Sequence, residues 1–159
     1  FAKAVVEAAL IRTFNNVHRI TIRGEAGVIK TNSFDEVPTS LRFYAGGDKS
    51  VRGFDYREIS PTAEVIDPET GELIVDSIGG KYLATSSVEY AYQVADNWRV
   101  AAFVDAGTAT NDTSTTLTYS VGPGVHWLSP IGPVRLYVAR GFAPDENTWQ
   151  LHILLGPEL

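Results

Sequence analysis

The stretch Ile20–Val28, ITIRGEAGV, alternates strictly between two kinds of residue. Its even positions hold isoleucine, glycine, alanine and valine, and its odd positions hold threonine, arginine, glutamate and glycine. A period of two residues is the pattern of a β-strand, whose successive side chains point to opposite faces. The stretch therefore predicts a strand with one apolar face and one charged face.

Similar alternation recurs in segments 82–94, 98–106, 116–127, 134–138 and 149–155. With a weaker segment at 2–13, the sequence predicts seven antiparallel strands. The predicted turns are tight at 15–16, 96–97 and 129–133, and longer at 32–80, 111–115 and 143–147. Short turns on one side and long loops on the other are typical of an outer-membrane β-barrel. Four aromatic residues near strand ends on the apolar face fit its aromatic girdles: Tyr82, Trp98, Trp127 and Trp149.

A soluble antiparallel sandwich is the main alternative, because its strands alternate in the same way. The predicted strands are about 11 to 14 residues long, however, against a usual length near 5 to 6. Their polar face also carries glycine and charge in mid-strand, which favours the barrel. Seven strands do not close an even-stranded barrel. We therefore expect either a part of a larger barrel or pairing with a second copy through the open sheet edges.

Composition narrows the classes of partner and location. The net charge of -6 disfavours a nucleic-acid partner. The chain has no cysteine, hence no disulfide or thiolate metal site, and no methionine, which indicates a piece of a longer protein. No apolar run approaches the roughly 18 to 20 residues of a membrane helix, but a membrane β-barrel needs no such run. The mean hydropathy of -0.04 fits alternating strands.

The segment Phe43–Phe54, FYAGGDKSVRGF, is a glycine-rich motif inside the longest predicted loop. It places Arg52 between valine and glycine. The part Gly47–Ser50 superficially resembles a phosphate-binding loop, but the GxxxxGK[ST] pattern is not met and no βαβ unit surrounds it. Nucleotide binding is therefore not predicted.

Extended to Pro61, the motif FYAGGDKSVRGFDYREISP resembles the long sixth extracellular loop of the BamA-type outer-membrane assembly superfamily, the bacterial surface antigen family. The segments GGKYLATSSVEYAYQV, WRVAAFVDAGTA, YSVGPGVHWLSPIGPVRLYVARGF and LHILLGPEL continue the resemblance in the family's order. Within the superfamily, GGDKSVRGF followed by ISP is most similar to the TamA family, the barrel subunits of the translocation and assembly module. BamA-like insertases and two-partner secretion transporters are the alternatives.

The resemblance implies that residues 1–159 are the C-terminal part of a sixteen-stranded transmembrane β-barrel in the bacterial outer membrane. It places loop 32–80 on the extracellular side, folded into the lumen, with POTRA domains and earlier strands outside this sequence. The implied function is to insert or secrete autotransporters and other barrel proteins, without a cofactor or catalytic residues. The implied partners are a TamB-like periplasm-spanning protein, unfolded client proteins and the lipid bilayer.

The resemblance also implies where the motif binds. Arg52 is expected to contact acidic residues on the two strands that follow, which correspond to Glu89 and Asp105. The alternation independently puts both carboxylates on the polar face, and an arginine fork suits carboxylates. Gly53 is expected to allow a tight turn and Phe54 to pack into the lumen wall. The remaining predicted motif residues are Gly46, Gly47 and Val51.

The predicted terminal strand, Thr148–Gly156, is the second candidate site. The resemblance implies that it closes the barrel through a weak seam where client strands pair, and an ordinary closing strand is the alternative. The predicted gate residues are Trp149, Leu151, Ile153, Leu155 and Gly156. The end Gly156–Leu159 departs from the terminal aromatic residue of most outer-membrane barrels.

Three other possibilities are weaker. The histidines His18, His126 and His152 fall on different predicted strands without ligand spacing, so no metal site is predicted. A hydrolase built from Asp105, Ser120 and His126 or His152 lacks a GxSxG elbow. The segment Asp67–Glu72 reads as the turn of an acidic surface hairpin.

Overall fold

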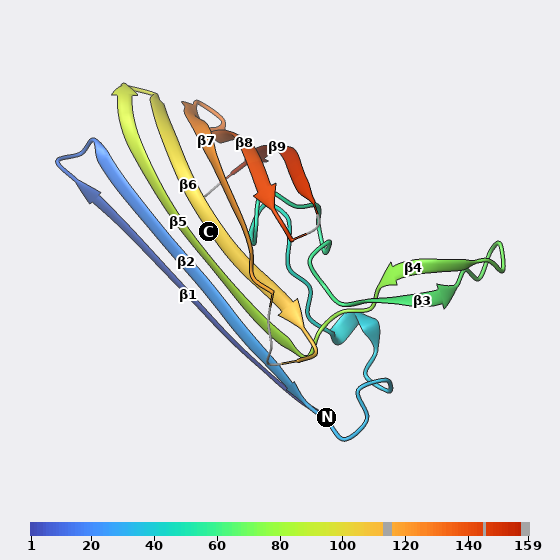
Figure 1. The fold of residues 1–159 in the computed structure, drawn as a ribbon. Coiled ribbons are helices and arrows are strands. Elements are labelled where there is room, and N and C mark those ends of the chain that lie inside the picture. Colours follow the sequence, from blue (N-terminus) through green and yellow to red (C-terminus); the bar gives the residue numbers. More distant parts are fainter. Residues whose placement is uncertain (113–115, 145, 157–159) are drawn as a thin grey trace.

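The computed structural model describes residues 1–112, 116–144 and 146–156, and these form a curved antiparallel β-sheet (Figure 1). The sheet has seven strands in the order β1-β2-β5-β6-β7-β8-β9. Their bounds are β1 Ala2–Phe14, β2 His18–Lys30, β5 Tyr82–Ala95, β6 Trp98–Thr110, β7 Thr118–Ser129, β8 Gly132–Phe142 and β9 Asn147–Leu155. The prediction of an all-β sheet of seven antiparallel strands is confirmed.

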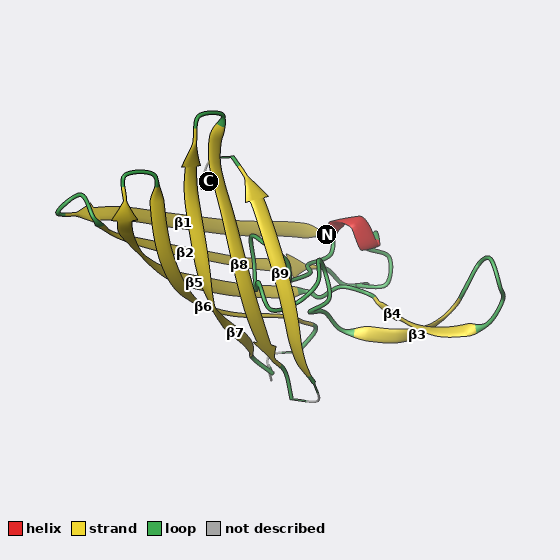
Figure 2. Cartoon of the chain, turned by 90° about the horizontal axis from the view of Figure 1, so that it is seen from above, coloured by secondary structure: helices red, strands yellow, loops and turns green. Residues whose placement is uncertain are grey.

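A long loop, residues 31–81, joins β2 to β5 and lies along the concave side of the sheet (Figures 1 and 2). It contains a short 3-10 helix, Thr39–Leu41, and a separate two-stranded hairpin of β3 Thr62–Ile66 and β4 Leu73–Ser77. The turn of that hairpin holds the acidic residues predicted there, and the Asp67 N–H donates to the Glu72 carbonyl over 2.8 Å. The hairpin projects away from the sheet (Figure 1).

The two faces of the sheet follow the predicted alternation. In β5, Val88, Tyr90 and Tyr92 are exposed on the convex face, whereas Ser87 and Glu89 are buried beneath the loop. The same division holds in the neighbouring strands, because residues opposite one another in the pairing registers point to the same face of the sheet. The convex face is therefore apolar and open, and the concave face carries the polar groups.

Aromatic side chains near the strand ends pair across neighbouring strands on the convex face. Trp98 and Trp127 lie opposite one another in β6 and β7, with stacked rings whose centroids are 5.8 Å apart. Tyr119 and Phe142 stack across β7 and β8 at the other end, 5.1 Å apart. Cross-strand aromatic pairs of this kind stabilise a sheet by about 0.2 to 1 kcal/mol each.

The apolar core lies between the loop and the concave face rather than between two sheets. One cluster joins loop residues to β2, β5 and β6 and contains Ile29, Val37, Phe43, Ala45, Leu83 and Ala109. A second cluster lies farther along the sheet and contains Phe103, Tyr137 and Ala139. Because the loop supplies half of the first cluster, its position is fixed by packing as well as by polar contacts.

The end of the chain differs from the prediction. Strand β9 ends at Leu155, and Gly156 lies just beyond it with a φ of 105°, a conformation that favours glycine. The Gly156 N–H still donates to the Pro133 carbonyl over 2.9 Å. The departure predicted at residues 157–159 lies outside the described residues. Within the described ranges, no helix has the length and apolar character needed to cross a membrane.

Candidate functional site

The tip of the long loop is a compact turn that points at the sheet. Gly46 and Gly47 have φ values of 103° and 97°, which side-chain-bearing residues rarely adopt. The Gly47 N–H donates to the Phe54 carbonyl over 3.0 Å, and the Phe54 N–H donates to the Val51 carbonyl over 3.2 Å. These bonds close the turn around Arg52. Val51, Arg52 and Phe54 are all buried.

Arg52 forms a two-pronged contact with Asp105 of β6. Its Nε donates to Oδ2 and its Nη2 donates to Oδ1, each over 2.8 Å. The backbone N–H of Arg52 also donates to Oδ2, over 3.0 Å. Asp105 is fully buried, so this carboxylate is satisfied by the loop rather than by water. Charge-assisted, bidentate pairs of this type are the strongest protein hydrogen bonds.

The same guanidinium reaches β5. Its Nη1 lies 2.5 Å from Oε2 of Glu89, and its Nη2 donates to the Ser87 hydroxyl over 3.1 Å. The rings of Phe103 and Tyr137 flank its Cζ at 3.7 and 4.7 Å from their centroids. One arginine thus contacts two carboxylates and two aromatic rings. We call Arg52, Glu89 and Asp105 the Arg52 cluster.

Two further side chains extend the Arg52 cluster to β7 and β8. The Tyr137 hydroxyl donates to Oε1 of Glu89 over 3.2 Å. It also lies 2.9 Å from Nε2 of His126, which in turn is 3.4 Å from Oε1 of Glu89. Glu89 therefore contacts the loop through Oε2 and the strands β7 and β8 through Oε1. The polar groups form a connected network across four strands.

The protonation of Arg52 follows from these contacts. Burial by itself lowers the pKa of Arg52, but hydrogen bonds and Coulombic attraction from Asp105, together with Glu89, raise the pKa above its ordinary value. The guanidinium is therefore charged at neutral pH. A permanent cation held between two carboxylates is a structural tie rather than a proton-transfer group.

Gly53 has a different role from the one predicted. It is not among the described glycines with positive φ, so the expected turn does not require it. A Cβ at this position would lie 2.5 Å from Cα of Gly141 and 2.5 Å from Cβ of Ser120. Glycine is needed because the loop backbone approaches β7 and β8 too closely for any side chain. Val51 makes a similar close approach to Gly107 of β6, where an added Cβ would lie 2.7 Å from its Cγ2.

The predicted gate residues of β9 lie apart from the Arg52 cluster. Trp149, Leu151, Ile153 and Leu155 are exposed on the convex side. The concave side of the same strand does reach the loop, through Thr148 and His152, which sequence reasoning did not assign to the site. Thr148 donates to the Gly53 carbonyl, and His152 contacts Asp48 and the Arg52 carbonyl.

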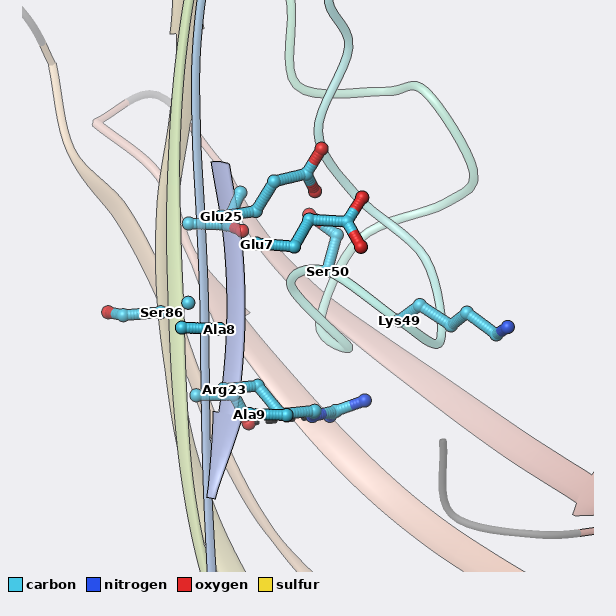
Figure 3. Close-up of a pocket in the computed structure, with 11 residues that line it drawn as sticks. Glu7, Ala8, Ala9, Arg23, Glu25, Lys49, Ser50 and Ser86 are labelled. Carbon is cyan, nitrogen blue, oxygen red and sulfur yellow. Dashed lines mark hydrogen bonds between the residues drawn. The ribbon is translucent and has the colours of Figure 1, made fainter. Parts of the chain in front are cut away.

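A cavity of about 450 Å³ lies beside the Arg52 cluster, between the loop tip and strands β1, β2 and β5 (Figure 3). Glu7 and Glu25 are opposite one another in the β1–β2 register, and Figure 3 shows both pointing toward the loop. Arg23 and Lys49 contribute the opposite charge. Among the described residues, no three His, Cys, Asp and Glu side chains gather where they could hold a metal ion.

The predicted hydrolase residues are placed as follows. Asp105 accepts three hydrogen bonds from Arg52, His126 faces Tyr137 and Glu89, and His152 faces the loop. Ser120 is buried in β7 opposite Asp105 in the β6–β7 register. Asp105 and His152 thus contact the loop directly, and His126 belongs to the network around Glu89.

Comparison with known proteins agrees with the fold. The Omp85 superfamily domain matches residues 1–156. The outer membrane protein assembly factor BamA of Nitratidesulfovibrio vulgaris is 35% identical over 154 residues, covering 92% of this chain and 18% of that protein. The BamA of Neisseria meningitidis serogroup B is 32% identical over 156 residues, covering 76% of this chain and 19% of that protein.

A solved structure is also similar. The crystal structure of BamA from Haemophilus ducreyi lacking POTRA domains 1-3 superimposes with a TM-score of 0.73 and 25% identity, over 95% of this chain and 33% of that one. The chain thus spans about a fifth of the length of the curated relatives. Members of the matched family are outer-membrane β-barrel proteins, which confirms the predicted location. The seven-stranded sheet, the motif and these similarities show that the chain belongs to the Omp85 superfamily.

Proposed function

We propose that this chain is the C-terminal part of a sixteen-stranded barrel that helps to insert other β-barrel proteins into the bacterial outer membrane. The two curated relatives, both named as outer membrane protein assembly factors, support this function. The observation that carries the proposal is the buried contact of Arg52 with Glu89 and Asp105. It holds a long loop against the concave wall, which then becomes the inner wall of the barrel.

The open edges of the sheet support a larger barrel. Strands β1 and β9 are the ends of the seven-stranded order, so each pairs with one neighbour only in the described part of the chain. In a bilayer, unpaired backbone groups cost several kcal/mol each, so both edges need partners. Further strands of the same protein supply them in our proposal. Pairing with a second copy is the alternative.

The experiment is an insertion assay with the full-length protein in lipid vesicles and an unfolded outer-membrane barrel as client. The Arg52→Ala variant should insert the client several-fold more slowly, because the loop is no longer fixed to the wall. Asp55→Asn, an exposed change in the same loop, should keep the wild-type rate. Wild-type insertion by Arg52→Ala would refute the proposal that the Arg52 cluster serves assembly.

The finer assignment that we propose is the TamA type, with a TamB-like partner and autotransporter clients. The motif GGDKSVRGF followed by ISP supports it. A BamA-like insertase is the second candidate, because both curated relatives are BamA proteins. Co-purification of the full-length protein with a TamB-like protein would favour the TamA type. Purification of the full-length protein without such a partner would favour a BamA-like insertase.

For the terminal strand we propose a gating role, in which β9 pairs with the first strand of the complete barrel and opens to client strands. Its end position in the sheet supports this role. Its exposed convex residues Leu151, Ile153 and Leu155 would face lipid. A disulfide that joins β9 to the first strand should stop insertion. Full activity of the cross-linked protein would contradict gating.

We further propose that the protein is not an enzyme and uses no cofactor. Asp105, which a hydrolytic site would need, accepts three hydrogen bonds from Arg52. The test is incubation of the pure full-length protein with lipid and peptide substrates. Hydrolysis that Ser120→Ala abolishes would refute this proposal.

A further inference from the structure

The last strand is tied to the loop by a second set of contacts. On β9, Nδ1 of His152 contacts Oδ1 of Asp48, and Nε2 of the same ring contacts the backbone carbonyl of Arg52. Four residues earlier in the same strand, Thr148 donates to the Gly53 carbonyl. His152 is buried, with 8% of its surface exposed. A built contact between loop and strand is therefore present apart from the Arg52 cluster.

The partners of His152 are two oxygen atoms of the loop tip. One belongs to the Asp48 carboxylate and the other to the Arg52 backbone carbonyl, and both groups can accept hydrogen bonds. The two ring nitrogens therefore join β9 to two different residues of the loop.

Of the described groups that pack around His152, Asp48 supplies the carboxylate in contact with the ring. On β8, Tyr137 lies directly opposite His152, and Arg135 lies opposite Leu154. On β9 itself, the neighbours on the same face are Gln150 and Leu154, which carry no charge. In the loop, Lys49 points away from β1 and β2 (Figure 3), and the Arg52 guanidinium is bonded to Glu89 and Asp105. Asp48 is the carboxylate that contacts the His152 ring.

Arg52 joins the two sets of contacts. Its side chain and its N–H bind β5 and β6, whereas its carbonyl accepts from His152 of β9. In the sheet order, β9 is separated from β6 by β7 and β8. The loop is therefore a direct connection across the concave side between strands that are not neighbours.

We propose that His152, held between Asp48 and the Arg52 carbonyl, is a positioning residue that fastens the loop to the last strand of the sheet. Its effect is to couple the position of β9 to that of β5 and β6. This inference rests on contacts within the chain and does not depend on the proposed function.

The test observes the ring directly, by NMR of full-length protein labelled with ¹⁵N in its histidine rings. The His152→Gln variant identifies the His152 signals by difference. In Asp48→Asn we expect the His152 ring signals to shift, because the group that faces Nδ1 has changed, while Asp55→Asn leaves them in place. His152 signals that are the same in the wild type and in Asp48→Asn would overturn the proposal.

A second measurement separates positioning from simple packing. Spin labels at Val104→Cys on β6 and Ile153→Cys on β9, both exposed on the convex face, report the distance between the two strands. Asp48→Asn should broaden this distance distribution, whereas Asp55→Asn should leave it as in the wild type. Distributions that are the same in the wild type and in Asp48→Asn would contradict the coupling. Because Asp48 is about half exposed, its variant is suited to this test even if His152→Gln does not fold.

Discussion

Arg52 and Asp105, 53 residues apart in sequence, meet through two parallel hydrogen bonds of 2.8 Å, Nε to Oδ2 and Nη2 to Oδ1. Neither side chain is more than 1% exposed. Removal of one partner of a buried ion pair leaves the other charge uncompensated, which costs about 3 to 5 kcal/mol. The position of the long loop therefore depends on this contact.

The planar fork of arginine is essential in this account. Lysine at position 52 keeps the charge but offers a single nitrogen, so it cannot contact both oxygens of Asp105 and also reach Glu89 and Ser87. We expect Arg52→Lys to lower the free energy of unfolding by about 1 to 3 kcal/mol. Denaturant unfolding of the full-length protein in lipid vesicles measures this. A lysine variant as stable as the wild type would contradict the role of the fork.

Gly53 should tolerate no side chain. In Gly53→Ala the new Cβ would meet Cα of Gly141 at 2.5 Å, so the loop must move away from β8. We expect a loss of about 1 to 3 kcal/mol, the usual cost of overpacking. Gly24→Ala on β2 is the matched control, because its Cβ would meet the Thr85 carbonyl at an ordinary 3.7 Å. Equal stabilities of the two variants would show that the close approach of the loop is absent.

The Tyr137 hydroxyl links Glu89 to His126, so its removal leaves buried polar atoms without that donor. Tyr137→Phe should lower the free energy of unfolding by about 1 to 3 kcal/mol. Tyr90→Phe removes a hydroxyl that contacts His18 over 2.7 Å at an exposed site and should cost much less. If the two variants lose the same stability, the buried network around Glu89 contributes no more to stability than an exposed hydrogen bond does.

The alternating pattern was sufficient to predict the strands and which side of the sheet each residue faces. Glu89 and Asp105 could be placed on the polar face from parity alone, because a period of two leaves no other choice within a strand. The path of the loop could not be predicted this way. It depends on close packing between Gly53 and Gly141, which are far apart in sequence.

Some partners left a signal in the sequence that could have been used. Gly141 lies inside β8, and a glycine inside a strand often marks close approach of another backbone. Tyr137, His126 and His152 gave no such signal, because polar residues on a lumen face are expected in any barrel. Their roles emerge only once the register between β7, β8 and β9 is known.

The pH dependence of the Arg52 contribution follows from its raised pKa. A group whose pKa is higher in the folded state contributes its full stability below the unfolded-state pKa and loses it only as the pH rises through the folded value. For arginine both values lie far above neutrality. The stability difference between wild type and Arg52→Gln should therefore stay constant between about pH 7 and about pH 9. Unfolding curves recorded across this range test it, and a difference that shrinks with rising pH would contradict the account.

The most direct test of the central claim is a double-mutant cycle between Arg52 and Asp105. The free energy of unfolding of the full-length protein is measured for Arg52→Ala, Asp105→Ala, the double variant and the wild type. We predict that the double variant is more stable than the sum of the single losses implies, by more than about 1 kcal/mol, because neither Arg52 nor Asp105 is left facing the other's missing charge. Glu89 loses Arg52 in both the single and the double variant, so its loss cancels in the cycle. Additivity of the two losses within about 0.5 kcal/mol would show that Arg52 does not hold the loop through Asp105.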